Sequence, residues 1–276
     1  MNFESQFISS TQNPRIKNIV KLRNRRARNK QKLFLVEGYR GVRRALDNGF
    51  EMSEIYFCPD WFLGHNEIPM IEEAAEKGTK VFEISKEVFE KIAYRDRPEG
   101  LLAVAPQFGL GLEELDVHEN SLFVVGEGIE KPGNLGTILR SADAAGADAV
   151  VVCDACTDLF NPNVVCASVG TMFTMKLAET TTEDFIAWCR EKGVQTLATT
   201  PHTDFAYDHV DMTGPTAIVM GTEQYGLKET WMEQADQKVL IPMFGQADSL
   251  NVATATTLVL FEAVRQRREK NIGKYS

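Results

Sequence analysis

The sequence contains no apolar run of membrane-spanning length, and its first residues lack the apolar core of a signal peptide. Five cysteines are an odd number, which does not suggest a disulfide framework in a chain of 276 residues. The four histidines, His65, His118, His202 and His209, form no cluster with metal-ligand spacing. We therefore expect a cytoplasmic protein with no membrane segment and no metal.

Two phosphate-binding signatures are also missing. No Walker-type loop is present, and Gly126-Glu127-Gly128 lacks a third glycine at dinucleotide-binding spacing. A nicotinamide-dependent oxidoreductase is therefore disfavoured. Cys153 and Cys156 have redox or metal spacing, but no second pair completes a zinc site. We interpret these two cysteines as structural, and whether they have another role stays open.

Charge is distributed unevenly along the chain. The net charge is −9, yet residues 13–44 contain twelve lysines and arginines and one acid, Glu37, so this region carries +11 and the remainder −20. Such asymmetry is typical of a polyanion-binding module joined to an acidic body, although a single solvated basic helix is the alternative.

The order of apolar and polar segments predicts two α/β domains. Residues 1–12 read as a loose polar tail, and strands and helices then alternate through residue 105. Residues 106–120 hold glycines and acids without an apolar run, which indicates a linker. The alternation resumes in residues 121–276, with strands expected at 122–125, 149–153, 173–178, 194–198, 217–220 and 238–241. A final helix over residues 252–269 should bury Leu258, Phe261 and Val264.

The stretch from Glu130 to Gly146 reads as a loop and a helix between two strands. Arg140 falls opposite the apolar face of this helix, four residues after Gly136. Helical side chains lean toward the N-terminus, so the Arg140 side chain would lie over Gly136, where no side chain blocks it. The Arg140 guanidinium could therefore reach back toward the loop that carries Asn134. A solvated surface arginine is an equally acceptable interpretation of this stretch alone.

Two later stretches also bear polar groups after strand-like runs. Gly221-Thr222-Glu223 with Gly226-Leu227 follows a buried-type strand, and a solvated turn is the simpler reading. Ile241-Pro242-Met243 follows the last strand. Ser249-Leu250-Asn251 then opens the final helix, where Ser249 and Asn251 are suited to helix capping. Capping is compatible with function, because backbone amides at a helix start bind ligands well.

Together these three stretches resemble, in order and spacing, the signature motifs of the SpoU (TrmH-type) family of RNA ribose 2′-O-methyltransferases, within the SPOUT superfamily. The motif residues lie in 121–276. Residues 13–38 resemble the substrate-binding domain of many members, and residues 160–170 resemble a further family segment. In that segment Cys166 stands where a basic residue is expected.

The resemblance implies a parallel-sheet methyltransferase domain with a deep trefoil knot over residues 121–276. A small basic α/β RNA-binding domain (residues 1–105) and a linker (residues 106–120) would precede it. It further implies S-adenosylmethionine as cofactor, RNA as partner and a homodimer that completes the site. Gly221, Ile241 and Leu250 correspond to cofactor contacts, and the catalytic group would comprise five residues: Arg140, Asn134, Glu223, Ser249 and Asn251.

In this group Arg140 would stabilise the developing alkoxide, since arginine keeps its proton in proteins, with a general base as the alternative. Ribosomal RNA is favoured as substrate on family analogy. The alternatives are a transfer RNA ribose 2′-O-methyltransferase and a non-catalytic RNA-binding protein that retains the fold.

Overall fold

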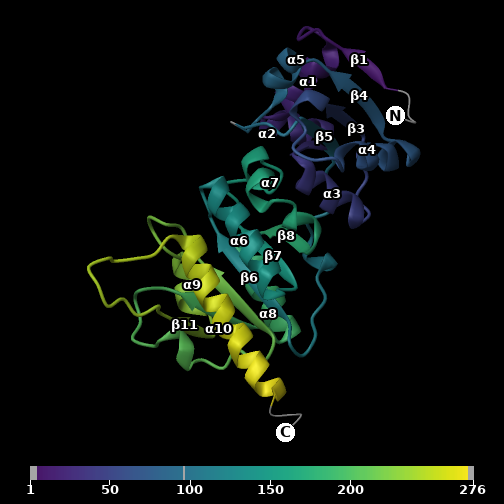
Figure 1. Ribbon diagram of the computed structural model, residues 1–276. Helices are drawn as coiled ribbons and strands as arrows, with labels where there is room; N and C mark the ends of the chain where they lie inside the picture. The colour runs from purple at the N-terminus through teal and green to yellow at the C-terminus, as the bar shows by residue number, and fades with distance from the viewer. Residues whose placement is uncertain (1–4, 96, 273–276) are drawn as a thin grey trace. The chain divides into compact units, whose positions relative to one another are not determined.

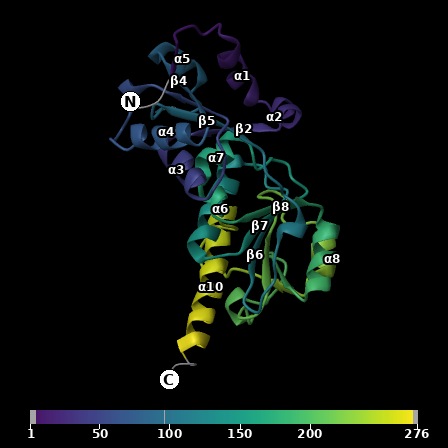
Figure 2. The ribbon, with the colours of Figure 1, turned by 90° about the vertical axis from the view of Figure 1, so that its right-hand side faces the viewer.

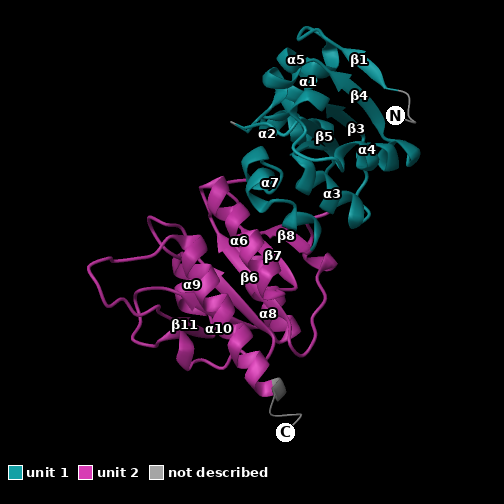
Figure 3. Cartoon of the chain, in the orientation of Figure 1, with its two compact units in different colours: residues 1–108, 158–174 teal, residues 109–157, 175–276 magenta. Residues whose placement is uncertain are grey.

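The computed structural model of the protein describes residues 5–95 and 97–272 (Figure 1). Two compact units are present (Figure 3): residues 1–108 with 158–174 form the first, and residues 109–157 with 175–276 form the second. No helix in the described part is both long and apolar enough to cross a membrane.

The sheet of the first unit has five strands in the order β1-β4-β3-β5-β2. β1 (Gln6–Ile8), β4 (Lys80–Ile84) and β3 (Glu54–Phe57) are parallel to one another, and β5 (Leu101–Pro106) runs antiparallel to both β3 and β2 (Leu33–Glu37). The expectation of a loose tail was wrong for residues 6–8, because they form an edge strand with Ile8 buried. A strand of three residues is too short to show an alternating pattern in the sequence. Residues 1–4 of the expected tail lie outside the described residues.

Helices cover this sheet. They are α1 (Pro14–Leu22), α2 (Arg25–Gln31), α3 (Tyr39–Asp47), α4 (Glu67–Glu76) and α5 (Lys86–Ile92), with a 3-10 turn, η1 (Pro59–Trp61). The Asn13 side chain caps α1, and Ser85 caps α5 by accepting from the Val88 amide at 3.3 Å. The apolar face of α1 is buried at Ile16, Ile19 and Leu22.

Residues 158–174, from within the motif-bearing half of the chain, pack into the first unit. They contain α7 (Pro162–Ser168) and the turn η3 (Thr171–Phe173). The Phe160 and Phe173 rings lie 4.8 and 6.2 Å from the Phe34 ring, centroid to centroid. The buried Arg28 side chain donates to the Asp158 carboxylate at 2.8 Å. Arg28 is therefore a packing residue and not one of the solvated cations of the basic region.

The second unit contains a six-stranded sheet, parallel throughout, in the order β11-β9-β10-β6-β7-β8. Its strands are β6 (Leu122–Glu127), β7 (Ala149–Cys153), β8 (Lys176–Thr180), β9 (Gln195–Thr199), β10 (Thr216–Met220) and β11 (Gln237–Val239). β6, β7 and β10 are buried at every position, as expected for central strands with both faces covered.

Helices lie on both faces of this sheet. α6 (Pro132–Ala145) and α10 (Val252–Ile272) pack together on one face, and α8 (Thr182–Lys192) lies on the other (Figure 2). α9 (Glu229–Gln234) contacts α8, and its Trp231 joins the buried cluster that contains Phe123 and Phe185. Short 3-10 turns are η2 (Leu112–Glu114) and η4 (Tyr207–His209). α6 ends where the sequence predicts, at Gly146, whose φ of +68° lies in the left-handed region.

Two sequence expectations for this half were wrong. The strand expected over 173–178 begins only at Lys176, because Phe173 belongs to a 3-10 turn and packs in the aromatic cluster of the first unit. In α10, Leu258 and Phe261 are 41% and 45% exposed. The side chains that the helix buries instead are Val252, Ala253, Thr256, Val259, Leu260 and Ala263.

Candidate functional site

A cavity of about 450 Å³ lies at the carboxyl ends of β9, β10 and β11. Five of the eight sequence-predicted site residues line it: Gly221, Glu223, Ile241, Ser249 and Leu250. Parallel sheets bind ligands at this edge, where the loops that follow the strands converge. The three remaining predicted residues, Asn134, Arg140 and Asn251, do not line the cavity in this chain.

Gly221 leads into a tight turn that forms one wall of the cavity. Thr222 and Gly226 exchange backbone hydrogen bonds of 3.0 and 3.1 Å, and Gly226 has φ +70°. A Cβ atom at position 221 would collide with the backbone of Gly226 and Leu227. The glycine is therefore required by close backbone approach, and the wall of the cavity is main chain.

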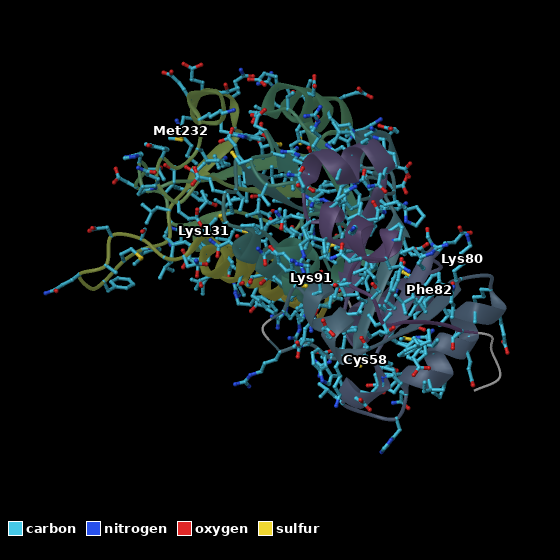
Figure 4. The ribbon with its side chains drawn as sticks, turned by 90° about the horizontal axis from the view of Figure 1, so that it is seen from above. Cys58, Lys80, Phe82, Lys91, Lys131 and Met232 are labelled. Carbon is cyan, nitrogen blue, oxygen red and sulfur yellow. The ribbon has the colours of Figure 1, made fainter. Side chains whose placement is uncertain are left out.

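Asn134, Glu223 and Asn251 form one hydrogen-bonded chain beside the cavity. The Asn134 side-chain nitrogen donates to the Glu223 carboxylate, and the Asn134 side-chain oxygen accepts from Asn251 at 3.1 Å. Lys131, labelled in Figure 4, places its ammonium 3.9 Å from the same Glu223 oxygen. Asn251 also accepts from the Ala253 amide at 3.0 Å, so it caps α10 and contacts Asn134 at once.

Arg140 lies apart from this chain. It is exposed on α6, and within residues 5–95 and 97–272 it makes no hydrogen bond or ion pair. Its expected reach toward Asn134 therefore stays a prediction. Arg140 and Asn134 are six residues apart on one helix, which separates them by about 9 Å along the axis.

A second polar cluster, which the sequence did not reveal, holds the loop after β10. The Glu127 carboxylate is buried and accepts from the Lys228 amide and from the Thr182 hydroxyl, each at 2.8 Å. The Lys228 ammonium in turn lies 2.6 Å from the Asp154 carboxylate. These contacts tie the 221–228 loop to the ends of β6 and β7. In the sequence, only the position of Glu127 and Asp154 at the ends of predicted strands could have indicated this cluster.

Gly128, which follows Glu127, has a structural explanation. The amide of Gly128 donates to the carbonyl of Cys153 at 3.0 Å, and Gly128 has φ +60°. Cys153 is buried, and burial raises the pKa of its thiol, whereas Cys156 is exposed. Both thiols are free, and no group of metal-ligating side chains occurs within the described ranges.

The lining of the cavity suits a ligand with an apolar ring and a few polar atoms. Apolar side chains from Met220, Leu240, Ile241 and Leu250 line it. The Thr199 hydroxyl also lies at the cavity, buried and without a hydrogen-bond partner among the described residues. An orphaned buried hydroxyl beside an open cavity is explained if a ligand supplies its partner. Thr199 ends β9, so the general preference of ligands for strand ends could have found it.

Comparison with known proteins places these features in a family. The sequence pattern of the SpoU rRNA methylase family matches residues 121–261, and that of the MRM3-like substrate binding domain matches residues 13–103. The chain is 28% identical over 254 residues to 23S rRNA (guanosine(2553)-2′-O)-methyltransferase RlmP of Bacillus subtilis, covering 92% of this chain and 97% of the relative. It is 31% identical to 23S rRNA (uridine(2479)-2′-O)-methyltransferase of Streptomyces viridochromogenes, covering 89% and 87%.

The fold agrees with these matches. The crystal structure of an AdoMet-bound rRNA methyltransferase from Sinorhizobium meliloti superimposes with a TM-score of 0.87 at 33% identity, covering 95% of this chain and 98% of that chain. Two motifs that are far apart in sequence line one cavity, the third is hydrogen-bonded to them through Asn134, and the family pattern spans about half of the residues. The chain belongs to the SpoU rRNA methylase family.

Proposed function

We propose that this protein transfers a methyl group from S-adenosylmethionine to a ribose 2′-hydroxyl of ribosomal RNA. The observation that carries the proposal is the meeting of Gly221, Ile241 and Leu250 around one cavity, with the chain of Asn134, Glu223 and Asn251 beside it. The two curated relatives described above act on ribosomal RNA but on different nucleosides. We therefore propose ribosomal RNA as the substrate class and do not assign the nucleotide that is methylated.

The cavity fits S-adenosylmethionine in size and in chemistry. A volume of about 450 Å³ lies within the usual range for small-molecule sites. Gly221, Ile241 and Leu250 contribute main-chain groups and apolar contacts, which suit an adenine ring, and the Thr199 hydroxyl at the cavity has no hydrogen-bond partner among the described residues. When bound, S-adenosylmethionine supplies a methyl group on a sulfonium, from which it is readily displaced.

The residues around the cavity align the ribose and stabilise negative charge. A hydroxyl becomes a good nucleophile only as its proton leaves, so the site must orient it and support the developing alkoxide. Arg140 supplies that support, as an always-charged donor. Asn134 positions the ribose, Glu223 orients Asn134 and Lys131, and Ser249 and Asn251 hold the loop that opens α10.

A homodimer brings Arg140 to the site. Arg140 is exposed and does not line the cavity of its own chain, while Leu258 and Phe261 leave apolar surface exposed on α10. α6 and α10 are joined by a 2.7 Å hydrogen bond between Ser141 and Thr257, the neighbours of Arg140 and Leu258. We infer that this helix pair forms the dimer interface and that Arg140 serves the site of the second copy.

A deep trefoil knot over the C-terminal half belongs to the same proposal. In its support, the segment after β11 runs beside the loop after β9. The Leu240 amide donates to the Phe205 carbonyl at 2.9 Å, and the Tyr207 amide donates to the Leu240 carbonyl at 3.0 Å. A backbone trace in an experimental density map tests this, and a chain that closes without threading would contradict it.

The first unit binds the RNA substrate. α1 and α2 expose Lys17, Lys21, Arg26 and Lys30, which are suited to phosphate contacts. Residues 1–105, with residues 158–174 packed into the same unit, then act as the RNA-binding domain, and the rest of residues 121–276 acts as the methyltransferase domain, joined by the linker at 106–120. A ribosomal RNA substrate also implies a cytoplasmic location, which cell fractionation would check.

Incubation with methyl-labelled S-adenosylmethionine and separated RNA pools tests the function. We expect label in ribosomal RNA and little in transfer RNA. Label confined to transfer RNA would favour the transfer RNA alternative. Binding of S-adenosylmethionine and RNA without transfer to any pool would instead indicate a non-catalytic RNA-binding protein.

A further inference from the structure

A second cavity, of about 620 Å³, lies wholly within the first unit and shares no residue with the site at the strand ends of the second unit. It is bordered by the start of α3, the loop before α4, the segment after α5, and α7. The side chains that matter for its chemistry are Tyr39, Arg40, Glu67, Arg95, Glu99 and Cys166.

Glu67 presents an unused acceptor at this cavity. The residue is only 4% exposed. Its Oε1 accepts from the Gly64 amide at 3.0 Å, whereas its Oε2 is buried and has no hydrogen-bond partner among the described residues. A buried carboxylate oxygen without a donor is costly and rare in folded proteins. A ligand that brings an N–H donor to Oε2 would account for it.

One arginine of the cavity is held in place and one is available. Arg95 donates to the Glu99 carboxylate at 2.7 Å, and Glu99 also accepts from the Tyr39 amide at 3.3 Å. Arg40 is exposed and makes no hydrogen bond or ion pair within residues 5–95 and 97–272. An available cation and an unused acceptor therefore border the same cavity.

Glu37 and Gly38 pack against the segment that carries Arg95. The Glu37 carboxylate accepts from the Tyr94 amide at 2.7 Å and is buried. Gly38 has φ +93°, and a Cβ atom there would lie 2.9 Å from an Arg95 nitrogen. Cys166 borders the same cavity, at a position where the family resemblance implies a basic residue. Burial raises the pKa of the Cys166 thiol, so this side chain is uncharged at neutral pH and the available positive charge is that of Arg40.

We propose that this cavity takes up one unpaired nucleobase of the RNA substrate, with guanine preferred. Glu67 accepts from the base and Arg40 contacts the adjoining phosphate. Guanine presents two adjacent N–H donors on its Watson–Crick edge. One would donate to Oε2 of Glu67 and the other to Oε1, because each carboxylate oxygen can accept two hydrogen bonds and Oε1 receives only that of the Gly64 amide. Proteins read single-stranded RNA in this way, by hydrogen bonds to splayed bases together with phosphate contacts. The inference rests on the proposed function, because it assigns this unit to the same RNA substrate.

Glu67→Gln in the full-length protein tests the inference. The substitution keeps an acceptor for the Gly64 amide but removes the charge and places an amide at Oε2. Glu76→Gln is the matched control, an exposed acid on the same helix and outside this cavity. We expect Glu67→Gln to raise KM for ribosomal RNA about tenfold, which corresponds to about 1.4 kcal/mol. kcat and S-adenosylmethionine affinity should be unchanged, and Glu76→Gln should behave as the parent protein.

A second readout separates this inference from the proposed function. Guanosine 5′-monophosphate should shift the NMR signals of the Gly64 and Glu67 amides in the parent protein and not in Glu67→Gln, and uridine 5′-monophosphate should shift them less. Arg40→Ala, a change at an exposed residue, should weaken ribosomal RNA binding several-fold. Unchanged RNA binding in both variants, or no shift with the guanine nucleotide, would overturn the inference. Absence of methyl transfer with the guanine response intact would instead count against the proposed function alone.

Discussion

The Asn134 side chain joins the Glu223 carboxylate and the Asn251 amide, which lie 89 and 117 residues further along the chain. Glu223 lies in the loop after β10, Asn251 immediately precedes α10, and Asn134 lies in the first turn of α6. One amide therefore fixes the relative position of three segments. Because Asn251 also caps α10, its two tasks can be separated by substitution.

Asn251→Asp and Asn251→Ala should differ in stability but not in activity. Aspartate still caps α10 but has no N–H to donate to Asn134, whereas alanine can neither cap the helix nor donate to Asn134. We expect both variants to lose most methyl transfer. Only Asn251→Ala should also lose stability, by about 1 kcal/mol. Turnover assays and thermal unfolding check this, and near-normal activity of Asn251→Asp would remove the Asn134 contact from the mechanism.

Gly221→Ala should abolish S-adenosylmethionine binding. Its Cβ atom would collide with the backbone of Gly226 and force the cavity wall to move. Gly226→Ala is the control, because a Cβ atom there meets nothing within 4 Å and only its positive φ is unfavourable. The control should lose about 1–2 kcal/mol of stability and keep measurable cofactor binding. Equal cofactor affinity in the two variants, measured by calorimetry, would contradict the role of this wall.

Mixing inactive subunits should restore activity if Arg140 serves the partner's site. Arg140→Ala should bind S-adenosylmethionine normally but fail to transfer methyl, and Gly221→Ala should fail to bind it. In a hybrid dimer one site would combine an intact cavity with an intact Arg140. Random exchange would then give about a quarter of the parent activity. Mixtures as inactive as the separate variants would place Arg140 in the site of its own chain.

The contact between Lys228 and Asp154 should contribute stability that is lost in acid. Burial raises the pKa of Asp154, but hydrogen bonds from Lys228 and Thr182 outweigh burial, and the pKa lies below its ordinary value. Asp154 therefore stabilises the fold above about pH 4, the pKa of an unfolded aspartate, and this contribution disappears as pH falls through the lower folded value. Because the Lys228 side chain is 57% exposed, the gain is at most about 1 kcal/mol.

Asp154→Asn isolates this contribution. Asparagine also tolerates the positive φ of 49° at this position. The free energy of urea unfolding, measured between pH 3 and 6, should fall less steeply with acid in the variant than in the parent protein. Parallel pH profiles would show that the Lys228 contact does not stabilise the fold.

Central strands and helix ends were predictable because local chemistry determines them. β7 is an unbroken apolar run, β6 and β10 contain such runs at residues 122–125 and 217–220, and Gly146 ends α6 in a conformation that glycine favours. The orientation of α10 was not predictable in the same way. Residues 258–261 are all large and apolar, so the packing partner, and not the periodicity, decides that Val259 and Leu260 are buried.

Site residues that belong to a sequence motif could be predicted. Site residues that gain their role through contacts with distant parts of the chain could not. Gly221, Glu223, Ile241, Ser249 and Leu250 were found by resemblance and do line the cavity. Thr199 and Glu127 were missed, because an ordinary threonine and a strand-end glutamate gain their roles only through neighbours distant in sequence. The Glu67 carboxylate is a similar case, since its unused oxygen exists only in the folded unit.

The most direct measurement locates the transferred methyl group. Ribosomal RNA labelled by the protein with methyl-labelled S-adenosylmethionine is hydrolysed in alkali, which requires a free 2′-hydroxyl to cleave each linkage. Methyl transfer to the ribose should leave label in alkali-resistant dinucleotides, and none when Gly221→Ala is used. Label recovered in ordinary mononucleotides, which would place the methyl group on a base, would contradict it.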